Sequence, residues 1–244
     1  LNNESHNIQN ETRVKAIKDL STSSPHGYVH KFFSVESTDL QVGITVSESN
    51  KRITVVFRGS ESKYDWYYDL ALLTTKLHDN VYVHGGFHSQ LHGDQMYSKL
   101  CAEIFELASA NRDYEIYITG HSLGAALATL FGYELAREDY LKESKVTVVS
   151  FASPRVGNWD FRESFDAQEN LVHYRVTNDR DAVTAVPMIF FHHVGTNIAL
   201  SEDKCEIYEN YSYNTWFRYS LFSCFSVSDH NIDLYHARLL KHNW

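Results

Sequence analysis

The sequence predicts one α/β domain with a mixed, largely parallel sheet and helices on both faces. Short apolar runs with brief connections open the chain, as in antiparallel hairpins. A β-branched run then meets a glycine-containing turn and a run of small residues between Tyr114 and Leu130. A further β-branched run, Lys145–Phe151, is typical of a buried parallel strand. The 244 residues fit a single domain, and no linker-like stretch divides residues 1–244.

Charge and hydropathy limit the partners that we expect. The net charge is −9 with histidine counted as neutral, and the sequence has no basic run, so we expect no nucleic-acid partner. No apolar run reaches the length of a membrane-spanning helix, so we expect no transmembrane segment, although a neutral lipid surface is not excluded. The chain starts at Leu1 rather than methionine, so we expect a preceding piece to have been removed or left out. We expect a secreted monomer, with an intracellular protein as the alternative.

The three cysteines do not form an even set. Cys101 lies in a helical pattern, which predicts a buried thiol. Cys205 and Cys224 flank an irregular stretch, and a disulfide between them and two free thiols are equal alternatives.

The first predicted elements are a helix and three strands. Residues 1–20 are polar with a weak apolar face and predict a surface helix. Strand-like runs follow around Gly27–Val35, Leu40–Val46 and Arg52–Phe57. Their short connections favour antiparallel pairing.

A histidine-containing segment comes next. Val81–His84 predicts a strand that ends at a glycine pair, and a long helix is expected from there to about Ala110. His84, His88 and His92 suggest a metal site. Their spacing straddles the glycine pair, and no carboxylate or cysteine completes a ligand set, so we expect no metal.

The run Tyr114–Leu130, YEIYITGHSLGAALATL, is the part of the chain around which the rest is organised. Its order of residue types predicts a strand, a sharp turn and a buried helix. In that context the G-x-S-x-G pattern predicts a nucleophile elbow, with Ser122 exposed at a helix N-terminus where developing negative charge is favoured. Gly120 and Gly124 let strand and helix approach closely. The alternative is a structural turn.

The third strand runs directly into Arg58-Gly59-Ser60. A loop beside the nucleophile is where an oxyanion hole obtains its second donor, and Ser60 offers both a backbone N–H and a hydroxyl. The first donor is the backbone N–H of the residue after the nucleophile, Leu123. An ordinary turn at the end of a strand is the alternative.

The segment Glu61–Leu70, ESKYDWYYDL, places aromatic residues at helical spacing among charged ones. The aromatic side chains of Tyr64, Trp66 and Tyr67 could pack on the core. We favour the other interpretation, in which residues 61–70 form a lid over Ser122 that moves aside at a lipid surface.

Carboxylates follow the strand predicted at Leu171–Val176. Loops at the carboxyl ends of parallel strands converge on one site, so Asp179 and Asp181 are both candidates for the acid of a triad. Asp181 lies next to an apolar stretch, and a triad acid works best when it is partly buried. We therefore choose Asp181.

The base of such a triad comes after its acid in this type of fold. Five histidines follow Asp181: His192, His193, His230, His236 and His242. The apolar run Met188–Val194 predicts a strand, in which His192 and His193 would be packed side chains. His236 and His242 fall on solvent-facing helical or terminal positions. His230 lies in a polar loop before the final helix and is our choice.

Residues 201–228 are rich in aromatic residues and suggest an edge strand or hairpin. Core packing and a wall that contacts the acyl chain are equal explanations for these aromatic residues.

Taken together, the motifs resemble those of the lipase class 3 family, the fungal-type triacylglycerol lipases. The resemblance runs from about Ile53 to Tyr235 and is carried by VVFRGS with a following Asp-Trp, VHGGF, GHSLGAALA, FASPRVGN, VTNDRDAVTAVP, HHVGT and SDH. It implies an α/β-hydrolase fold with a lid near residues 61–70. It also implies a triad of Ser122, Asp181 and His230. The oxyanion hole that it implies consists of Ser60 and Leu123, and the implied lid is Tyr64–Asp69.

The activity that this resemblance implies is hydrolysis of acylglycerol esters through an acyl-enzyme, with no metal or cofactor. An esterase or phospholipase without interfacial activation, including a feruloyl-type esterase, is the first alternative. A non-catalytic binding module on a lipase scaffold is the second. Loss of a triad residue would mark that module, and all three residues are present.

Overall fold

The computed structural model describes residues 27–59, 73–208, 226 and 228–242. The helix predicted at residues 1–20, the lid segment 61–70 and the aromatic stretch after residue 208 lie outside these residues. Ser60, Tyr64, Trp66, Tyr67 and Cys224 lie outside them as well.

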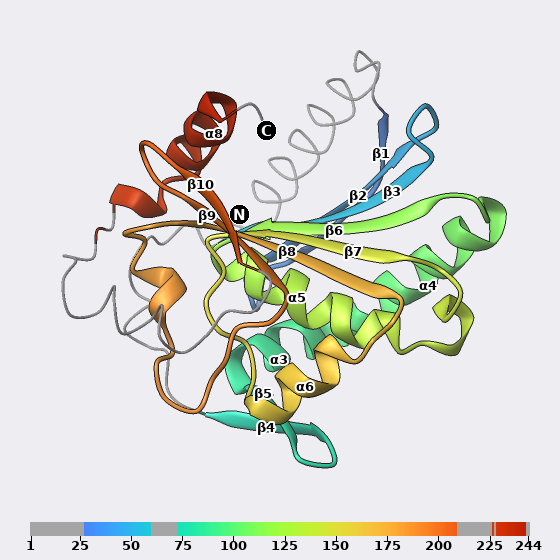
Figure 1. The fold of residues 1–244 in the computed structure, drawn as a ribbon. Coiled ribbons are helices and arrows are strands. Elements are labelled where there is room, and N and C mark those ends of the chain that lie inside the picture. Colours follow the sequence, from blue (N-terminus) through green and yellow to red (C-terminus); the bar gives the residue numbers. More distant parts are fainter. Residues whose placement is uncertain (1–26, 60–72, 209–225, 227, 243–244) are drawn as a thin grey trace, which may run out of the picture.

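A mixed sheet forms the centre of the described part (Figure 1). Its eight strands, in spatial order, are β1 (Tyr28–Val35), β2 (Leu40–Ser47), β3 (Arg52–Phe57), β6 (Glu115–His121), β7 (Val146–Phe151), β8 (Leu171–Asn178), β9 (Thr196–Leu200) and β10 (Cys205–Tyr208). The strands β3, β6, β7, β8 and β9 are parallel, and β1, β2 and β10 pair antiparallel at the two edges. The predicted antiparallel opening and parallel centre are confirmed.

Helices cover both faces of this sheet, as predicted (Figure 1). One face carries α3 (Gly85–His92), α4 (Met96–Ala110), α5 (Leu123–Ala136) and α6 (Trp159–Asp166), and the other carries α8 (Ile232–Lys241). Short 3₁₀ turns are η1 (Gly93–Gln95), η2 (Asp139–Leu141), η3 (Val183–Ala185) and η4 (Ser228–His230). A separate hairpin pairs β4 (Thr74–His78) with β5 (Val81–His84).

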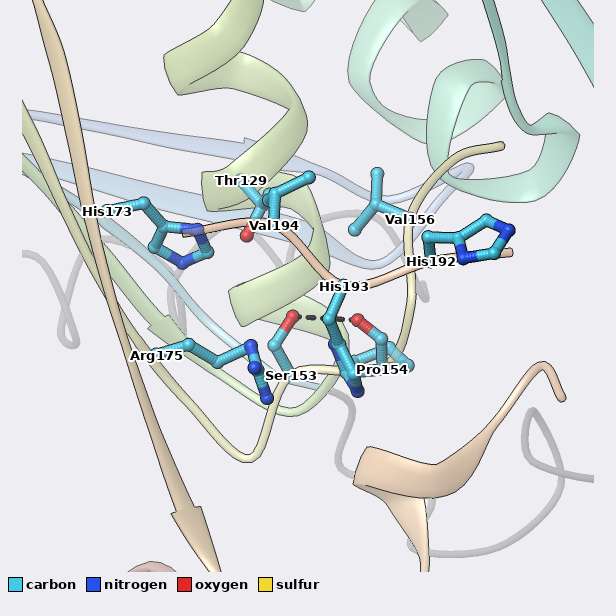
Figure 2. A pocket seen from close by; sticks show the side chains of 9 residues that line it. All are labelled: Thr129, Ser153, Pro154, Val156, His173, Arg175, His192, His193 and Val194. Carbon is cyan, nitrogen blue, oxygen red and sulfur yellow. Dashed lines mark hydrogen bonds between the residues drawn. The ribbon is translucent and has the colours of Figure 1, made fainter. Parts of the chain in front are cut away.

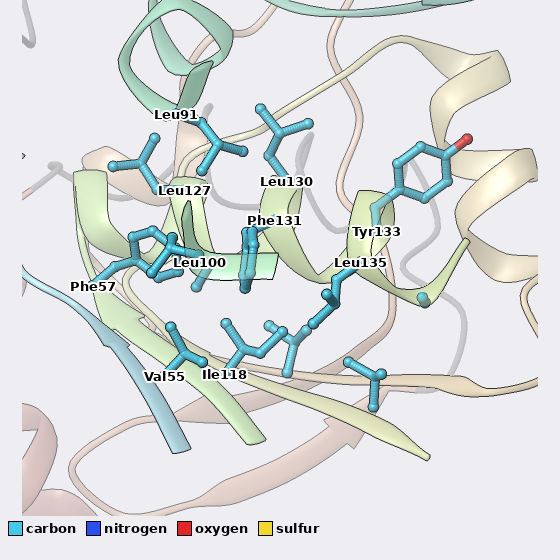
Figure 3. Close-up of a cluster of buried hydrophobic side chains, with 14 of the residues drawn as sticks. Val55, Phe57, Leu91, Leu100, Ile118, Leu127, Leu130, Phe131, Tyr133 and Leu135 are labelled. Atoms are coloured by element: carbon cyan, nitrogen blue, oxygen red, sulfur yellow. The ribbon is translucent and has the colours of Figure 1, made fainter. Parts of the chain in front are cut away.

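The central helix α5 is buried on nearly every side. Such a helix needs apolar and small residues all round, and its sequence LGAALATLFGYELA supplies them. Figure 3 shows Leu127 and Phe131 of α5 packed between Val55 and Ile118 of the sheet and Leu91 of α3. Truncation of the buried leucine, isoleucine or phenylalanine side chains among these to alanine typically costs about 2–5 kcal/mol. This packing fixes the N-terminus of α5, where Ser122 lies.

The long helix predicted up to Ala110 is wrong in one respect, because the chain breaks into α3 and α4. Asp94 and Gln95 adopt left-handed backbone angles, with φ of 50° and 58°, which interrupt the helix. The helical spacing also places Phe105 on one apolar face with Leu100 and Ile104, yet Phe105 is 49% exposed. The helical spacing of apolar residues continues across the break, so only the backbone angles reveal it.

The strand predicted at Met188–Val194 is wrong as well. This stretch forms no strand, and β9 begins only at Thr196. Phe190 has a left-handed φ of 72°, so the backbone is not extended throughout the run. An apolar run therefore predicted the wrong element here.

Candidate active site

The turn between β6 and α5 has the geometry of a nucleophile elbow. Ser122 has φ of 60° and ψ of −125°, a sparsely populated region that costs on the order of 1–3 kcal/mol. The two glycines of the motif make the turn possible. A Cβ on Gly120 would lie 2.3 Å from the carbonyl oxygen of Gly124, and a Cβ on Gly124 would lie 2.4 Å from that of Phe57. No other residue type fits these two positions without displacing backbone.

The structure brings Ser122, His230 and Asp181 into one chain of hydrogen bonds. The Ser122 hydroxyl lies 2.8 Å from Nε2 of His230, and Nδ1 of His230 lies 3.0 Å and 2.9 Å from the two carboxylate oxygens of Asp181. A carboxylate only accepts hydrogen bonds, so Nδ1 carries the proton and Nε2 accepts from the serine. Asp181 is 2% exposed and Ser122 is 6% exposed. These three residues come from the ends of β6 and β8 and from η4 just before α8.

The structure also separates the two competing aspartates. Asp181 meets His230, whereas Asp179 lies 3.3 Å from the guanidinium of Arg238. Asp181 accepts two further hydrogen bonds, from the backbone N–H of Val183 at 2.9 Å and from the hydroxyl of Tyr235 at 2.7 Å. These donors stabilise the ionised carboxylate in its buried position.

Tyr235 is a part of the site that the sequence did not predict. Its hydroxyl donates to Asp181 and accepts from the backbone N–H of Asn178 at 2.9 Å. Burial and the neighbouring Asp181 carboxylate raise the pKa of Tyr235 well above its ordinary value, so the phenol stays protonated and keeps its donor role. Its position in α8, five residues after His230, could have been found only by knowing that α8 packs back onto the sheet.

Two further side chains hold the turn that carries His230. The Asn178 amide donates to the carbonyl of Asp229 at 2.8 Å, and Nε2 of His121 lies 2.9 Å from the carbonyl of His230. Burial, followed by the adjacent His230, lowers the pKa of His121 to about 4. His121 is thus neutral at physiological pH and can donate from Nε2. The only signal for His121 in the sequence is its place beside Ser122 in the G-x-S-x-G motif.

The two proposed oxyanion donors are described only in part. Leu123 is the first residue of α5, where a backbone N–H has no acceptor within the helix. Ser60 is outside the described residues, but its neighbour Gly59 is close to Ser122. A Cβ on Gly59 would lie 2.8 Å from the carbonyl oxygen of His121 and 3.7 Å from Cβ of Ser122. The loop after β3 therefore passes beside Ser122.

The remaining histidines have other surroundings. His193 lies 2.7 Å from the carbonyl of Thr184, and His236 is exposed on α8. In α3, the rings of His88 and His92 stack at 4.3 Å and His92 pairs with Glu134 at 3.0 Å. No group of histidine, cysteine and carboxylate side chains that could hold a metal ion occurs within the described ranges. Cys101 and Cys205 are free cysteines.

Buried polar residues lie beneath the N-terminal half of α5, around a small hollow (Figure 2). Its lining residues are Thr129, Ser153, Pro154, Val156, His173, Arg175, His192, His193 and Val194. Nε2 of His173 lies 2.8 Å from the hydroxyl of Ser150. Burial, and then the charge of Arg175, lowers the pKa of His173 to about 3 and that of His193 well below its usual value. Both imidazoles are neutral in the folded protein.

Three neutral histidines, of which His173 and His193 are buried, make the fold sensitive to acid. His121, His173 and His193 have lowered pKa values in the folded state, while an unfolded chain binds their protons near pH 6.5. Below about pH 6.5 the unfolded chain therefore binds more protons, and the free energy of unfolding falls as the pH drops toward 4. The expected slope is about 1.4 kcal/mol per pH unit for each histidine. Urea unfolding at pH 7.0 and 5.0 measures it.

A matched pair of variants identifies the source of that slope. His173→Gln is expected to remove one histidine's share of the pH dependence, although it also lowers stability at pH 7. His236→Gln, on an exposed position, is expected to leave the slope unchanged. Equal slopes in the wild type and His173→Gln would contradict the assignment.

Comparisons with known proteins agree with this architecture. A family model for Lipase (class 3) matches residues 54–191. Phospholipase A1-II 1 of Oryza sativa subsp. indica is 30% identical over 171 residues, covering 62% of this chain and 44% of that protein. Secreted mono- and diacylglycerol lipase A of Penicillium cyclopium is 32% identical over 159 residues, covering 64% and 50% respectively. The crystal structure of a lipase from Rhizopus microsporus var. chinensis matches with a TM-score of 0.75 and 29% identity, covering 84% of this chain and 73% of that one.

The sheet order and the similarity to lipase structures define an α/β-hydrolase fold. The chain belongs to the lipase class 3 family, so the resemblance found in the motifs is confirmed. The chain spans half or less of the length of the two curated relatives named above. Among the residues that the structure describes, no helix combines the length and apolar character needed to cross a membrane.

Proposed function

We propose that this chain hydrolyses the carboxylic esters of glycerolipids through a serine acyl-enzyme. The observation that carries the proposal is the hydrogen-bonded chain from Ser122 through His230 to Asp181 at a nucleophile elbow. In α/β-hydrolases this order and geometry of side chains activates a serine for acyl transfer. Membership of the lipase class 3 family supports a lipid ester as substrate.

In the first half of the reaction, the Ser122 hydroxyl attacks the ester carbonyl while Nε2 of His230 takes its proton. Asp181 holds the imidazole in the correct tautomer and stabilises the imidazolium that forms. We propose that the N–H of Leu123 and the N–H and hydroxyl of Ser60 stabilise the oxyanion, at about 3 kcal/mol per donor. His230 then protonates the leaving alcohol. Water releases the fatty acid with His230 again as the base, and no metal or cofactor is needed in this scheme.

Two substrate classes compete within this reaction. The Penicillium relative is named as a mono- and diacylglycerol lipase, and the rice relative is named as a phospholipase A1. We propose acylglycerols first and phospholipids second. Fatty acid release from tributyrin emulsions and from phosphatidylcholine vesicles distinguishes them, because a lipase hydrolyses the emulsion faster and a phospholipase A1 prefers the vesicles. An equal lack of Ser122-dependent release from both would contradict the proposed substrate class.

We further propose that Tyr64, Trp66 and Tyr67 belong to a lid and take part in substrate binding. The rate on tributyrin then rises sharply once its solubility limit is passed and droplets form. A rate that saturates below that limit, with no further rise, would assign the chain to esterases without interfacial activation, including the feruloyl type.

We also propose that residues 1–244 act as one domain and as a secreted monomer. The Penicillium relative is named as secreted, which supports that location. Light scattering after size exclusion tests the oligomeric state, with the 28.2 kDa of one chain as the expected mass. A mass of two chains would contradict it.

Loss of the Tyr235 hydroxyl tests whether its hydrogen bond to Asp181 contributes to catalysis. Tyr235→Phe is expected to lower kcat about tenfold, equivalent to roughly 1.4 kcal/mol of transition-state stabilisation, because Asp181 loses a short hydrogen bond. It is also expected to lower the free energy of unfolding by about 1–3 kcal/mol, because the buried N–H of Asn178 loses its acceptor. Steady-state kinetics and urea unfolding measure the two effects. Unchanged kcat would remove Tyr235 from the site.

A further inference from the structure

Met188, Ile189 and Phe190 form an exposed apolar tip on the segment between η3 and β9. Their exposed fractions are 55%, 71% and 51%. Single exposed apolar residues are normal on a protein surface, but contiguous large ones mark a site of interaction. We call these three residues the apolar tip.

The apolar tip is held on a rigid base on its N-terminal side. The buried Arg155 donates from Nη1 to the carbonyls of Ala185 and Pro187, the second at 3.0 Å. Its backbone N–H donates to the carbonyl of Val186 at 2.8 Å. The guanidinium therefore fixes the chain just before the tip begins.

The chain is fixed again directly after the tip. Phe191 is 2% exposed, and its ring lies 5.7 Å from that of His84. The N–H of His192 donates to the carbonyl of Gly157 at 2.7 Å. The three exposed side chains are thus presented between two anchored ends.

Phe190 adds an independent observation. Its φ of 72° lies in the left-handed region, which is unfavourable for a bulky residue. A glycine would adopt this angle without strain. The Phe190 residue is about half exposed, so burial of its ring does not compensate for the strain. Strained residues that packing does not explain occur preferentially at functional sites. A role for the exposed ring explains why phenylalanine stands here.

The place of the apolar tip connects it to the triad. It follows Asp181 by only seven residues, through η3. Figure 1 shows the short orange turn η3 beside the end of the sheet where β6 and β8 finish, and the segment after η3 running on toward the β4–β5 hairpin. A partner that contacts the tip is therefore connected to the Asp181 loop through the short turn η3.

The surroundings of the tip indicate what kind of partner it fits. Trp159 is 51% exposed, its ring packs edge-on against His192 at 5.3 Å, and the guanidinium of Arg162 lies 5.0 Å from it. Exposed tryptophan with a basic neighbour is typical of the headgroup level of lipid surfaces. The net charge of −9 disfavours anionic lipids, so a neutral or zwitterionic surface fits better.

We propose that the apolar tip inserts into the surface of neutral or zwitterionic lipid and holds the Ser122 site at that interface. This inference rests on the proposed function, which requires a lipid ester substrate. It adds an anchor built on Met188, Ile189 and Phe190, distinct from the proposed lid at residues 61–70.

The test separates binding from turnover by using Ser122→Ala protein and sedimentation with phosphatidylcholine vesicles. In this inactive background, Ile189→Ser and Phe190→Gly are each expected to lower the partition coefficient about tenfold, and the combined M188S/I189S/F190G variant at least a hundredfold. Phe190→Gly is also expected to keep or raise the urea midpoint, because it relieves the left-handed strain. Loss of binding therefore cannot be attributed to unfolding.

Phe105→Ser is the matched control, since Phe105 is 49% exposed on α4 at the opposite end of the sheet (Figure 1). Its vesicle binding is expected to equal that of the parent. Equal binding by the triple variant and the parent, or an equal loss in Phe105→Ser, would overturn the proposal. Self-association that the triple variant abolishes, with vesicle binding intact, would assign the tip to a second copy instead.

A second measurement distinguishes failure of the anchor from failure of the proposed function. With Ser122 restored, the tip variants are expected to hydrolyse soluble p-nitrophenyl butyrate at the parent rate. Soluble-ester turnover together with tip-independent vesicle binding would reject the anchor alone. Tip-dependent vesicle binding with no Ser122-dependent turnover of any ester would reject the proposed function while keeping the anchor.

Discussion

Replacing Ser122 with alanine is expected to lower kcat on p-nitrophenyl butyrate by about a million-fold, because the proposed mechanism assigns the attacking oxygen to this residue. Only a residual rate from substrate binding and the oxyanion hole would remain. The substitution removes one oxygen and leaves the elbow glycines and α5 unchanged, so the urea midpoint is expected to stay close to that of the wild type. Stopped assays with high enzyme concentration measure the residual rate.

The matched control for Ser122→Ala is Ser164→Ala. Ser164 also forms a close side-chain contact, 2.6 Å from the hydroxyl of Tyr133, but it lies on α6 away from the triad. Its kcat is expected to remain within about twofold of the wild type, since nothing at the reacting centre changes. A Ser122→Ala protein that retains most of its ester turnover would show that the activity resides elsewhere.

Replacing Asp181 with asparagine is expected to lower kcat by about ten-thousand-fold. Asp181 accepts from His230, Tyr235 and the N–H of Val183, and all three are donors. An asparagine offers only one oxygen, and its NH₂ group turned toward His230 would favour the wrong tautomer. The imidazole Nε2 would then carry the proton and could not take one from Ser122. Steady-state kinetics on a soluble ester measure the loss.

Asp179→Asn provides the control for that experiment. The two aspartates are separated by one residue, yet Asp179 pairs with Arg238 and not with His230. Because Asp179 is a partly exposed ion-pair residue, its loss is expected to change kcat by less than about threefold. A larger effect from Asp179→Asn than from Asp181→Asn would reverse the assignment of the acid.

Local patterns predicted which residues lie together in the candidate active site. The β-branched run before Ser122 and the small residues after it specify strand, turn and buried helix within 17 residues, so no distant contact was needed to recognise the elbow. Asp181 and His230 could be chosen because loops after parallel strands converge at one edge of a sheet. The apolar residues Ala182 and Val183, which follow Asp181 directly, favoured Asp181 over Asp179.

The supports of the triad could not be predicted in the same way. His121, Asn178 and Tyr235 act through contacts between segments more than 50 residues apart, and their types alone did not indicate these partners. Such contacts depend on how α8 and η4 dock against the sheet, which no local pattern encodes.

The apolar run Met188–Val194 shows a different limit. A run of consecutive apolar residues predicts a buried strand. The same run can instead be exposed on the surface, and the sequence pattern does not distinguish the two cases. Here the left-handed angle at Phe190 and the exposure of Met188 and Ile189 decide the matter. The sequence pattern shows how hydrophobic a segment is, whereas only the tertiary structure shows what the segment contacts.

The most direct measurement of the central claim is mass spectrometry after reaction with a p-nitrophenyl alkylphosphonate. Attack by an activated Ser122 oxygen on phosphorus displaces p-nitrophenolate and leaves a stable phosphonyl ester on the protein. The proposed mechanism predicts one adduct per chain, located on Ser122, with one equivalent of p-nitrophenolate released and a rate that falls by orders of magnitude in Asp181→Asn. No adduct, or an adduct on another residue that Ser122→Ala leaves in place, would contradict it.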